Sequence, residues 1–335
     1  MRRVIPGLEA PDAALEADIG GRLDRVEEAL AKAVVADSDL LAATSTYLLS
    51  AGGKRFRPML VLLSGYLGDP SDPRLIPGSV AIELTHLATL YHDDVIDEAD
   101  DRRGVPSANA RWDNTVAILT GDYLFARASE ISADLGTDIS RLLARTIAVL
   151  CDGQIREVDA SGKLEQTEEA YLEIIRRKTA VLIATSCRLG GMLSDAADEH
   201  LETLEAFGES LGMAFQLSDD IMDVTASQLE LGKEPGTDMK EGVYTLPVLH
   251  ALNESPSREE LQRLLAHGAP DGEMLDRALQ VVRTGGSIEH ARAAVSAEVS
   301  RAVDLAERLP DGAARHALVQ LSLYLGIRCG ADVAR

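Results

Sequence analysis

The sequence predicts an all-α protein, and three observations support that prediction. Ala, Leu and Glu recur throughout the 335 residues, whereas only 4% of the residues are aromatic, a composition that favours helices over strands. Apolar residues repeat at intervals of three and four over long stretches, as they do on one face of a helix. No alternating apolar and polar run is long enough to predict a strand. With 46% hydrophobic residues the chain can bury a sizeable core, and we expect one domain over residues 1–335.

Helices follow one another along the chain, separated by stretches that contain glycine and proline. The first covers residues 22–50 and ends at the two glycines of AGGKRFRP. A nearly all-apolar helix starts at Pro58, and a longer one over 79–99 has an apolar N-terminal half and a charged C-terminal half. The stretch 230–242 is irregular. The remaining helices are predicted at 115–135, 137–159, 168–187, 198–226, 244–252, 257–266, 272–282, 286–308 and 312–329.

The charge balance excludes some classes of protein. The chain carries 55 acidic and 33 basic side chains, a formal net charge of -22. A nucleic-acid binder normally presents a basic surface, and an anionic membrane would repel this chain. The N-terminal MRRVIPGLEAPDA has no apolar run behind its basic start, so we do not expect a signal peptide. We therefore expect a cytoplasmic protein with no nucleic-acid partner and no stable membrane insertion.

Two acidic clusters stand at the predicted C-terminal ends of helices. HDDVIDEADDRRG places Asp93 and Asp97 four residues apart, so they lie one turn apart on one helix face and repel each other. Carboxylates are unfavourable at this end of a helix because its dipole is negative there. FQLSDDIMD repeats the pattern with Asp219, Asp220 and Asp223. A solvated acidic helix end would explain one cluster, but a second copy in the same position indicates cation sites.

The residue types in these clusters suggest which cation they bind. Oxygen ligands without cysteine or clustered histidine select a hard cation, and Mg²⁺ fits them better than Zn²⁺. Mg²⁺ keeps some of its waters and often takes further ligands from a substrate phosphate. We therefore expect the two clusters to face each other and to hold a diphosphate through bridging Mg²⁺ ions.

A diphosphate also needs cationic donors, and basic residues are concentrated at a few places in this acidic chain. Arginine binds phosphate with two parallel hydrogen bonds, while lysine supplies a mobile point charge. His86 lies two helical turns before Asp93 on a similar face, where it would be a neutral phosphate donor. Arg55, Arg176 and Arg177 are interpreted as members of surface salt bridges. The predicted phosphate-binding residues are Lys54, Arg57, Arg102, Arg103 and Lys178, and GKEPGTDMKEG adds Lys233 and Lys240.

Five motifs occur in the order and approximate spacing seen in trans-isoprenyl diphosphate synthases. They are GGKRFRP, HDDVIDEADDRRG, RRKTA, FQLSDDIMD and GKEPGTDMKEGVYTLP, and over about residues 40 to 250 the chain resembles a polyprenyl diphosphate synthase. The resemblance implies an all-α fold, a large helical bundle around a deep central cavity of the isoprenoid synthase type, and a homodimer. It also implies a Mg²⁺-dependent prenyltransferase that condenses isopentenyl diphosphate with an allylic diphosphate to an all-trans polyprenyl diphosphate.

The resemblance further implies roles for individual residues. Three Mg²⁺ ions per site would be held by Asp93, Asp94, Asp97, Asp219, Asp220 and Asp223. The allylic diphosphate would be bound by Arg102, Lys178 and Lys233, and isopentenyl diphosphate by Lys54, Arg57, His86 and Arg103. The catalytic residues would be Lys178, Thr179 and Gln216, with the oxygens of Thr179 and Gln216 directed at the developing allylic cation. Val243 departs from the pattern, because many relatives are basic there, and we expect it to weaken a secondary contact.

The length of the product is predicted from the helix that precedes Asp93. Relatives that stop at short products usually carry a bulky aromatic four or five residues before the first aspartate, where this chain has Thr89 and Ala88. An isoprene unit is about as long as one helical turn, ~5.4 Å, so these small residues should let the chain grow past that level. Leu84, or a residue of the helix over 115–135, would then be a later stop. We expect a medium- or long-chain product.

Several rival interpretations remain at this stage. Tyr91 could cap the cavity early, which leaves a short-chain product of farnesyl or geranylgeranyl length open. A class I terpene cyclase shares metal-triggered ionisation and an all-α fold, but it has no second diphosphate for GGKRFRP to hold. An inactive regulatory subunit would be expected to lose one aspartate cluster, and both are intact here.

Overall fold

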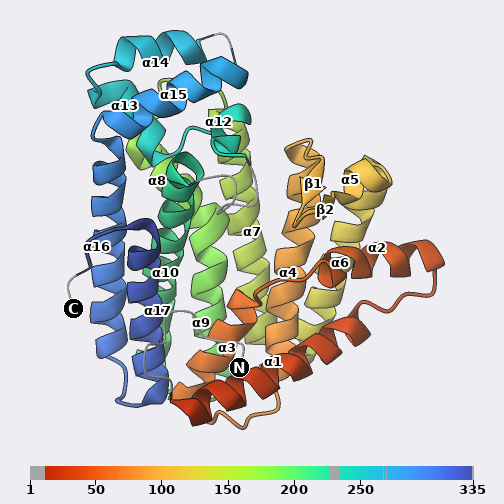
Figure 1. The fold of residues 1–335 in the computed structure, drawn as a ribbon. Coiled ribbons are helices and arrows are strands. Elements are labelled where there is room, and N and C mark those ends of the chain that lie inside the picture. The colour runs from red at the N-terminus through yellow and green to blue at the C-terminus, as the bar shows by residue number, and fades with distance from the viewer. Residues whose placement is uncertain (1–11, 227–233, 267, 269, 334–335) are drawn as a thin grey trace. The chain divides into compact units, whose positions relative to one another are not determined.

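Helices form almost all of the regular structure in the computed structural model, which describes residues 12–226, 234–266, 268 and 270–333 (Figure 1). Within those ranges the strands are a two-residue pair, β1 (Asp101–Arg102) and β2 (Val105–Pro106). The prediction of an all-α protein is therefore confirmed. None of the helices in the described ranges combines the length and the apolar character needed to cross a bilayer.

The chain forms two compact units, each built from separate stretches of sequence. Unit 1 comprises Met1–Ile147, Leu182–Glu205 and Glu307–Leu318, and unit 2 comprises Ala148–Val181, Ala206–Ala306 and Val319–Arg335. Because the boundaries fall inside helices, several helices contribute residues to both units. The expectation of one domain over residues 1–335 stays a prediction.

Unit 1 is organised around α4, the long helix that carries the first aspartate cluster. Helix α4 packs against α1, α3 and α6, and its side chains from Val80 to Leu84 are almost completely buried because this stretch is apolar apart from Glu83. The elements that lie wholly in unit 1 are α1 (Ala13–Ala33), α2 (Asp39–Ser50), α3 (Phe56–Ser64), η1 (Gly65–Leu67), α4 (Leu75–Ile96), β1, β2, α5 (Ala108–Arg111) and α6 (Asn114–Asp134).

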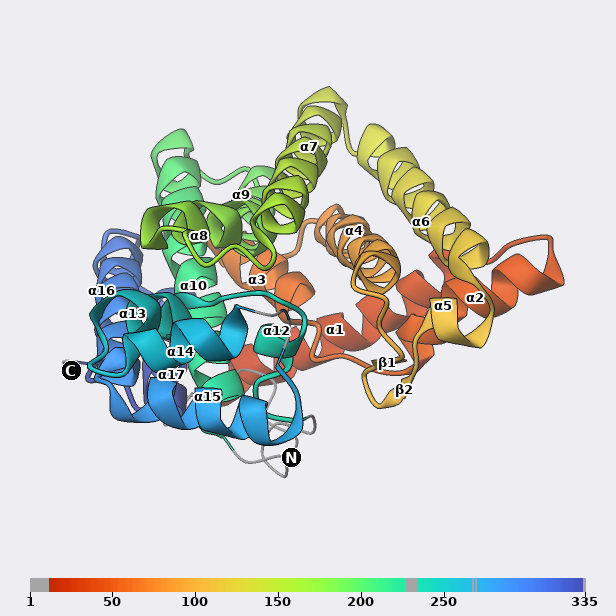
Figure 2. The same cartoon turned by 90° about the horizontal axis from the view of Figure 1, so that it is seen from above.

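Unit 2 contains the second aspartate cluster, near the end of α10. Its helices α13, α14 and α15 lie side by side (Figures 1 and 2). The remaining elements, some shared between the units, are α7 (Thr137–Ala160), α8 (Glu168–Ile175), η2 (Arg176–Ala180), α9 (Val181–Leu193), α10 (Asp198–Thr225), α12 (Thr237–Lys240), α13 (Leu246–Glu254), α14 (Arg258–Leu265), α15 (Gly272–Thr284), α16 (Ser287–Glu307) and α17 (Ala313–Cys329).

The prediction of one helix over residues 22–50 was wrong, because the chain breaks between α1 and α2. Backbone carbonyls at the end of α1 are satisfied by side chains instead of by further helical turns. Ser45 Oγ donates to the Val34 carbonyl at 2.9 Å, and Arg127 Nε donates to the Ala33 carbonyl at 2.8 Å. Tyr123 Oη donates to the carbonyl of Val35 at 2.8 Å. These partners come from α2 and α6, so local periodicity could not reveal the break.

Two further boundaries differ from the predictions. Helix α3 begins at Phe56, so Pro58 lies in its first turn, where a missing backbone N–H costs no helical hydrogen bond. The predicted helix over 168–187 is instead α8, the π-helical segment η2 and α9, which continues to Leu193. A π segment inside a helix often marks a functional site.

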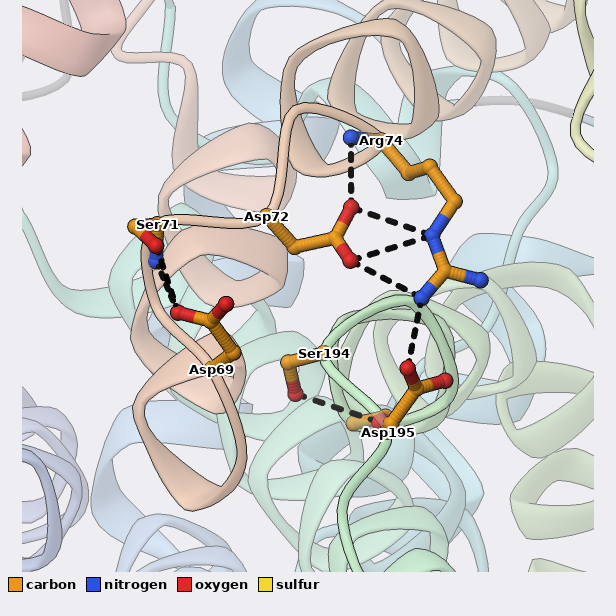
Figure 3. A network of polar contacts seen from close by, with 7 residues as sticks. Asp69, Ser71, Asp72, Arg74, Ser194 and Asp195 are labelled. Atoms are coloured by element: carbon orange, nitrogen blue, oxygen red, sulfur yellow. Dashed lines mark hydrogen bonds and ion pairs between the residues drawn. The ribbon is translucent and has the colours of Figure 1, made fainter.

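A polar network joins the loop before α4 to the end of α9 within unit 1 (Figure 3). Arg74 Nη2 donates to Asp72 Oδ2 at 2.9 Å and to Asp195 Oδ2 at 3.0 Å. The Asp69 backbone N–H donates to the Ser194 carbonyl at 2.7 Å, and a Cβ at Gly68 would lie only 2.0 Å from that carbonyl oxygen. The network therefore fixes the start of α4 at the end opposite its aspartates.

Gly190 allows α9 to pack closely on α3, and its replacement by alanine should destabilise unit 1. An added Cβ would lie 2.2 Å from the Val61 carbonyl oxygen. We expect Gly190→Ala to lower the free energy of unfolding by about 1–3 kcal/mol, as overpacking does in other cores, with a lower midpoint of thermal unfolding.

Gly21 in α1 provides a matched control, because a Cβ there would meet no atom within 4 Å. Gly21→Ala should raise the free energy of unfolding by about 0.5–1 kcal/mol, the helix-propensity difference between the two residues. Equal unfolding midpoints for the two variants would contradict the close packing of α3 and α9.

Candidate active site

The first aspartate cluster lies at the C-terminal end of α4 in unit 1, with its three carboxylates in different surroundings. Asp93 and Asp97 are partly exposed, and Asp97 is the C-cap residue. Asp94 is fully buried, and Arg102 Nε donates to its Oδ1 at 2.6 Å. Burial raises the pKa of Asp94, while the Arg102 guanidinium opposes that shift. One carboxylate of the cluster is thus an internal anchor, and two can meet a ligand from outside.

A β-hairpin places Arg102 and Arg103 beyond this cluster. Arg102 pairs with Val105, and the two turn residues, Arg103 and Gly104, have φ of 55° and 76°. Two positive φ values are characteristic of the type I′ turn that matches the twist of a two-residue hairpin. The strained Arg103 backbone is held by its own side chain, since Arg103 Nη1 donates to the Leu48 carbonyl at 3.0 Å and also to the Gly52 carbonyl.

Arg55, Arg57 and Arg103 gather around one carboxylate, Glu83, and His86 lies near these arginines. The three arginines and His86 are called the basic cluster here. Arg55 Nη1 donates to Glu83 Oε1 at 3.0 Å, and both side chains are buried. The Nε of Arg57 is buried and has no hydrogen-bond partner among the described residues, and burial lowers the Arg57 pKa to about 10. Burial, followed by the nearby arginines, lowers the pKa of His86 well below its usual range, so the imidazole is neutral.

The basic cluster holds an excess of positive charge that suits an anion. Three arginines surround Glu83, and Arg55 also pairs with Glu27 at the edge of the cluster. The predicted salt bridge of Arg55 is confirmed, although Arg55 is buried rather than on the surface. Lys54 is exposed. Glu83 was missed by the sequence analysis, although a single acid within the apolar half of the predicted helix over 79–99 was a signal for it.

The second aspartate cluster lies near the C-terminal end of α10 in unit 2. Asp219 forms an ion pair with Arg328 of α17, whose guanidinium also lies 5.6 Å from the Phe215 ring centroid. Asp220 is 1% exposed, and burial, with a smaller contribution from Asp238, raises its pKa to about 8. Asp223 is also buried, and its Oδ2 accepts from the Asp238 backbone N–H at 3.4 Å. Neither Arg328 nor Asp238 was identified from sequence.

The π segment η2 carries Lys178 and Thr179, two of the predicted catalytic residues. A Cβ at Gly153 of α7 would lie 2.7 Å from the Lys178 backbone nitrogen, and one at Gly212 of α10 would lie 2.6 Å from Ala180 Cα. Two glycines thus let neighbouring helices press directly on the backbone of the segment. Thr179 Oγ1 donates to Gln216 Oε1 at 2.9 Å, which brings these two predicted residues together.

Other cations of unit 2 are engaged with carboxylates. Lys178 Nζ pairs with Glu157, a contact that sequence reasoning missed. The predicted salt bridges of the two flanking arginines are confirmed: Arg176 pairs with Glu173 and Glu209, and Arg177 with Glu173 and Asp152. Lys240 Nζ donates to Glu234 Oε2 at 2.5 Å. Lys233 lies outside the residues that the structure describes.

The residues predicted to set chain length differ in exposure. Ala88 and Leu84 are fully buried in unit 1, whereas Thr89 is partly exposed and donates from Oγ1 to the His86 carbonyl at 2.7 Å. Tyr91 is fully buried, and its hydroxyl bonds the backbone of α2, donating to Thr44 O and accepting from the Leu48 N–H. Thr89 therefore shares the accessible face of α4 with His86 and Asp93. The role of all these residues in chain length stays a prediction.

The aspartates fit a hard divalent cation in chemical type. Within the described ranges, no three His, Cys, Asp or Glu side chains form a group that would hold a metal by themselves. Mg²⁺ does not require such a cage, because it keeps waters and takes substrate phosphates as ligands. Oδ2 of Asp94 is buried and lacks a hydrogen-bond partner in the described part of the chain. Mg²⁺ and Ca²⁺ prefer carboxylate oxygens as ligands, and here one such oxygen has no hydrogen-bond partner in the described part of the chain.

Comparison with known proteins identifies the class first. A geranylgeranyl pyrophosphate synthase from Corynebacterium glutamicum, complexed with calcium and isoprenyl diphosphate, has the same fold, with a TM-score of 0.84 and 41% identity. The match covers 95% of this chain and 98% of that one. The fold is thus that of the all-α isoprenoid synthases, and the chain is an enzyme of the prenyltransferase class.

Sequence comparison then gives the family. A family model described as polyprenyl synthetase matches residues 38–282. The nonaprenyl diphosphate synthase of Mycobacterium tuberculosis is 41% identical over 98% of both chains. Component 2 of the heptaprenyl diphosphate synthase of Geobacillus stearothermophilus is 40% identical, over 91% of this chain and 95% of its own length. The chain belongs to the polyprenyl synthetase family.

The pair of buried Asp94 and partly exposed Arg102 makes stability depend on pH. Because the folded-state pKa of Asp94 is raised, the stability linked to its proton is present below the unfolded-state pKa, about 3.9, and is lost as the pH rises through the folded-state value. Arg102→Gln removes the guanidinium that opposes the rise in the Asp94 pKa. More stability is then lost as the pH rises. We expect it to lower the free energy of unfolding by about 1–3 kcal/mol at pH 8 and by less at pH 5.

Thermal unfolding at the two pH values measures this effect. Arg141→Gln is the control, because Arg141 pairs with Asp138 on an exposed surface, where an ion pair contributes little at either pH. If Arg102→Gln lowered the free energy of unfolding equally at pH 5 and pH 8, Asp94 would not depend on Arg102 for its charge.

Proposed function

We propose that this enzyme condenses isopentenyl diphosphate with an allylic diphosphate and extends it to an all-trans polyprenyl diphosphate of medium or long chain. The observation that carries the proposal is the basic cluster, where three arginines surround a single buried glutamate and a neutral histidine lies near them. Net positive charge held in a partly desolvated place suits a diphosphate rather than a neutral substrate. Its position beside the first aspartate cluster suits a substrate bound next to a metal-held diphosphate.

Each diphosphate is assigned its own set of residues. Isopentenyl diphosphate is bound by Lys54, Arg57, His86 and Arg103, and the unsatisfied Nε of Arg57 supports its place in that set. The allylic diphosphate is bound by Arg102, Lys178 and Lys233. Arg102 and Lys178 now pair with Asp94 and Glu157, and would turn part of their donor capacity to phosphate. Arginine has five N–H donors, so Arg102 can keep its carboxylate and still bind an oxygen anion.

Three Mg²⁺ ions are assigned to the two aspartate clusters. Asp93, Asp97 and Asp219 are the main ligands, since each is accessible to some degree, while the more buried Asp94, Asp220 and Asp223 support them. Bound Mg²⁺ supplies positive charge that stabilises the departing diphosphate. The calcium in the Corynebacterium glutamicum structure supports a divalent ion in this family.

The remaining steps use the substrates and residues of the chain. The allylic C–O bond ionises as the cations stabilise the leaving diphosphate, and the double bond of isopentenyl diphosphate attacks the allylic cation. Thr179 and Gln216 direct oxygen atoms toward that cation. A proton then leaves the new chain, and the released diphosphate accepts it. Water must be excluded because it would quench the cation.

Two rival functions are less well supported. A terpene cyclase has no second diphosphate for the basic cluster to hold. An inactive regulatory subunit is disfavoured because both aspartate clusters are intact. We also propose a homodimer, for which the large apolar side chains exposed on α6, Ile118 at 42% and Leu119 at 60%, provide a surface in unit 1. The relative named as component 2 makes a heteromeric enzyme the alternative assembly.

The reaction is tested by incubating the purified chain with Mg²⁺, isopentenyl diphosphate and farnesyl diphosphate. We expect release of diphosphate and a longer prenyl product, both abolished by chelation of Mg²⁺. Asp93→Asn should lower kcat by about 100-fold or more, as loss of a transition-state contact does elsewhere. Asp138→Asn, on an exposed helix start, is the control and should keep full activity.

Two outcomes would contradict the proposal. Diphosphate release that continues without isopentenyl diphosphate would indicate a cyclase. Activity that appears only after a second protein is added would exclude an active homodimer. Light scattering on the active preparation measures the oligomeric state independently.

Product length is tested by placing larger side chains on α4 one turn before Asp93. Ala88→Phe, and Thr89→Phe at the more accessible position, should each shorten the product by one or more isoprene units, measured by chromatography after dephosphorylation. Ala31→Phe on the exposed face of α1 is the control and should leave the product unchanged. If both α4 variants fold and still make the wild-type product, these positions do not border the growing chain.

A further inference from the structure

Tyr171 of α8 is a buried residue whose hydroxyl reaches the second aspartate cluster of unit 2. The side chain is 3% exposed, and its hydroxyl donates to Asp220 Oδ2. Tyr171 belongs to none of the five motifs, and the functional assignments above do not use it.

The bond from Tyr171 is the first of a chain that ends at the π segment. Gln216 Nε2 donates to the other oxygen of Asp220, Oδ1, at 2.9 Å. Thr179 Oγ1 donates to Gln216 Oε1, also at 2.9 Å. Both oxygens of Asp220 therefore accept hydrogen bonds, one from α8 and one from α10.

The direction of the other two bonds follows from how the Gln216 amide lies in the structure. Its NH₂ group faces Asp220 and its oxygen faces Thr179. The single hydroxyl proton of Thr179 is then used on that amide oxygen. Any other group that approaches Thr179 Oγ1 meets lone pairs rather than a proton, which is the polarity that a carbocation requires.

We infer that Tyr171 is a positioning residue for prenyl transfer: through Asp220 it holds the Gln216 amide in the orientation that turns the Thr179 lone pairs toward the allylic cation. The inference rests on the proposed function, and it adds a residue and a mechanism to it. Without the hydroxyl, Asp220 keeps a single donor in the chain and can rotate, and the Gln216 amide is then free to turn over. The Thr179 proton would no longer be committed to the amide.

The surrounding backbone makes this orientation effective. Helix α8 continues directly into η2, so the element that carries Tyr171 also carries Thr179. Gly153 and Gly212 allow α7 and α10 to press on η2, which limits movement of the Thr179 backbone. Orientation of the hydroxyl proton is then the remaining freedom, and Tyr171 controls it.

Tyr171→Phe tests the inference because it removes the hydroxyl and keeps the ring. We expect kcat to fall by about 10- to 100-fold, with less than about a twofold change in the KM of either substrate and in the Mg²⁺ concentration for half-maximal activity. Tyr66→Phe is the matched control, since Tyr66 donates to Asp18 at 2.5 Å in unit 1, and it should keep the wild-type kcat. A purely structural Tyr171 would lower stability and leave kcat per folded molecule unchanged.

A double-mutant cycle asks whether Tyr171 acts through Gln216. Gln216→Leu alone should lower kcat. Adding Tyr171→Phe should lower kcat by less than about twofold more, because the hydrogen bonds from Asp220 to Thr179 are already lost. Multiplicative effects would overturn the inference. If Tyr171→Phe fails to fold, the same cycle with Thr179→Val and Gln216→Leu tests the chain from its other end, and multiplicative effects there overturn it as well.

The outcomes separate this inference from the proposed function. If the wild-type protein makes no prenyl product, the proposed function itself is refuted. An active wild type with an unchanged kcat in Tyr171→Phe leaves the prenyltransferase intact and refutes the positioning role.

Discussion

The ion pair between Arg55 and Glu83 is the interaction on which the basic cluster depends. Both side chains are buried, and an unpaired charge of either sign would be costly there. Glu83 also attracts Arg57 and Arg103, and so offsets part of the repulsion among three guanidinium groups. Because one carboxylate serves several cations, the cluster keeps positive charge available for a ligand. Loss of Glu83 would leave like charges packed together in an apolar place.

The second aspartate cluster shows the opposite balance. Asp219, Asp220, Asp223 and the nearby Asp238 bring four acidic side chains together, and one cation, Arg328, pairs with Asp219. Unit 1 therefore contains donors suited to phosphate beside its own aspartate cluster, and unit 2 contains carboxylates suited to a cation. Local concentrations of arginine in this acidic chain fit the phosphate-bearing substrates of the proposed function.

Features with short-range causes could be predicted from the sequence. The four-residue spacing of Asp93 and Asp97 and the polar end of an apolar helix placed the first cluster correctly at the end of α4. Long-range contacts could not be predicted in this way. Glu83 meets Arg55 from a different helix, and Asp219 meets Arg328 near the far end of the chain.

The break after α1 and the π segment were missed for a related reason. Side chains of α2 and α6 satisfy the carbonyls at the end of α1, and contacts at two glycines hold η2. The π segment also limits how many residues the polypeptide can have between α8 and α9. Its wide turn holds an additional residue, and in regular helix each residue advances the direction of the side chains by about 100°. Deleting one residue of Arg176–Ala180 would close this turn to regular winding and would displace Lys178 and Thr179 from Glu157 and Gln216, while α9 kept its orientation. This stretch should therefore tolerate substitutions far better than deletions.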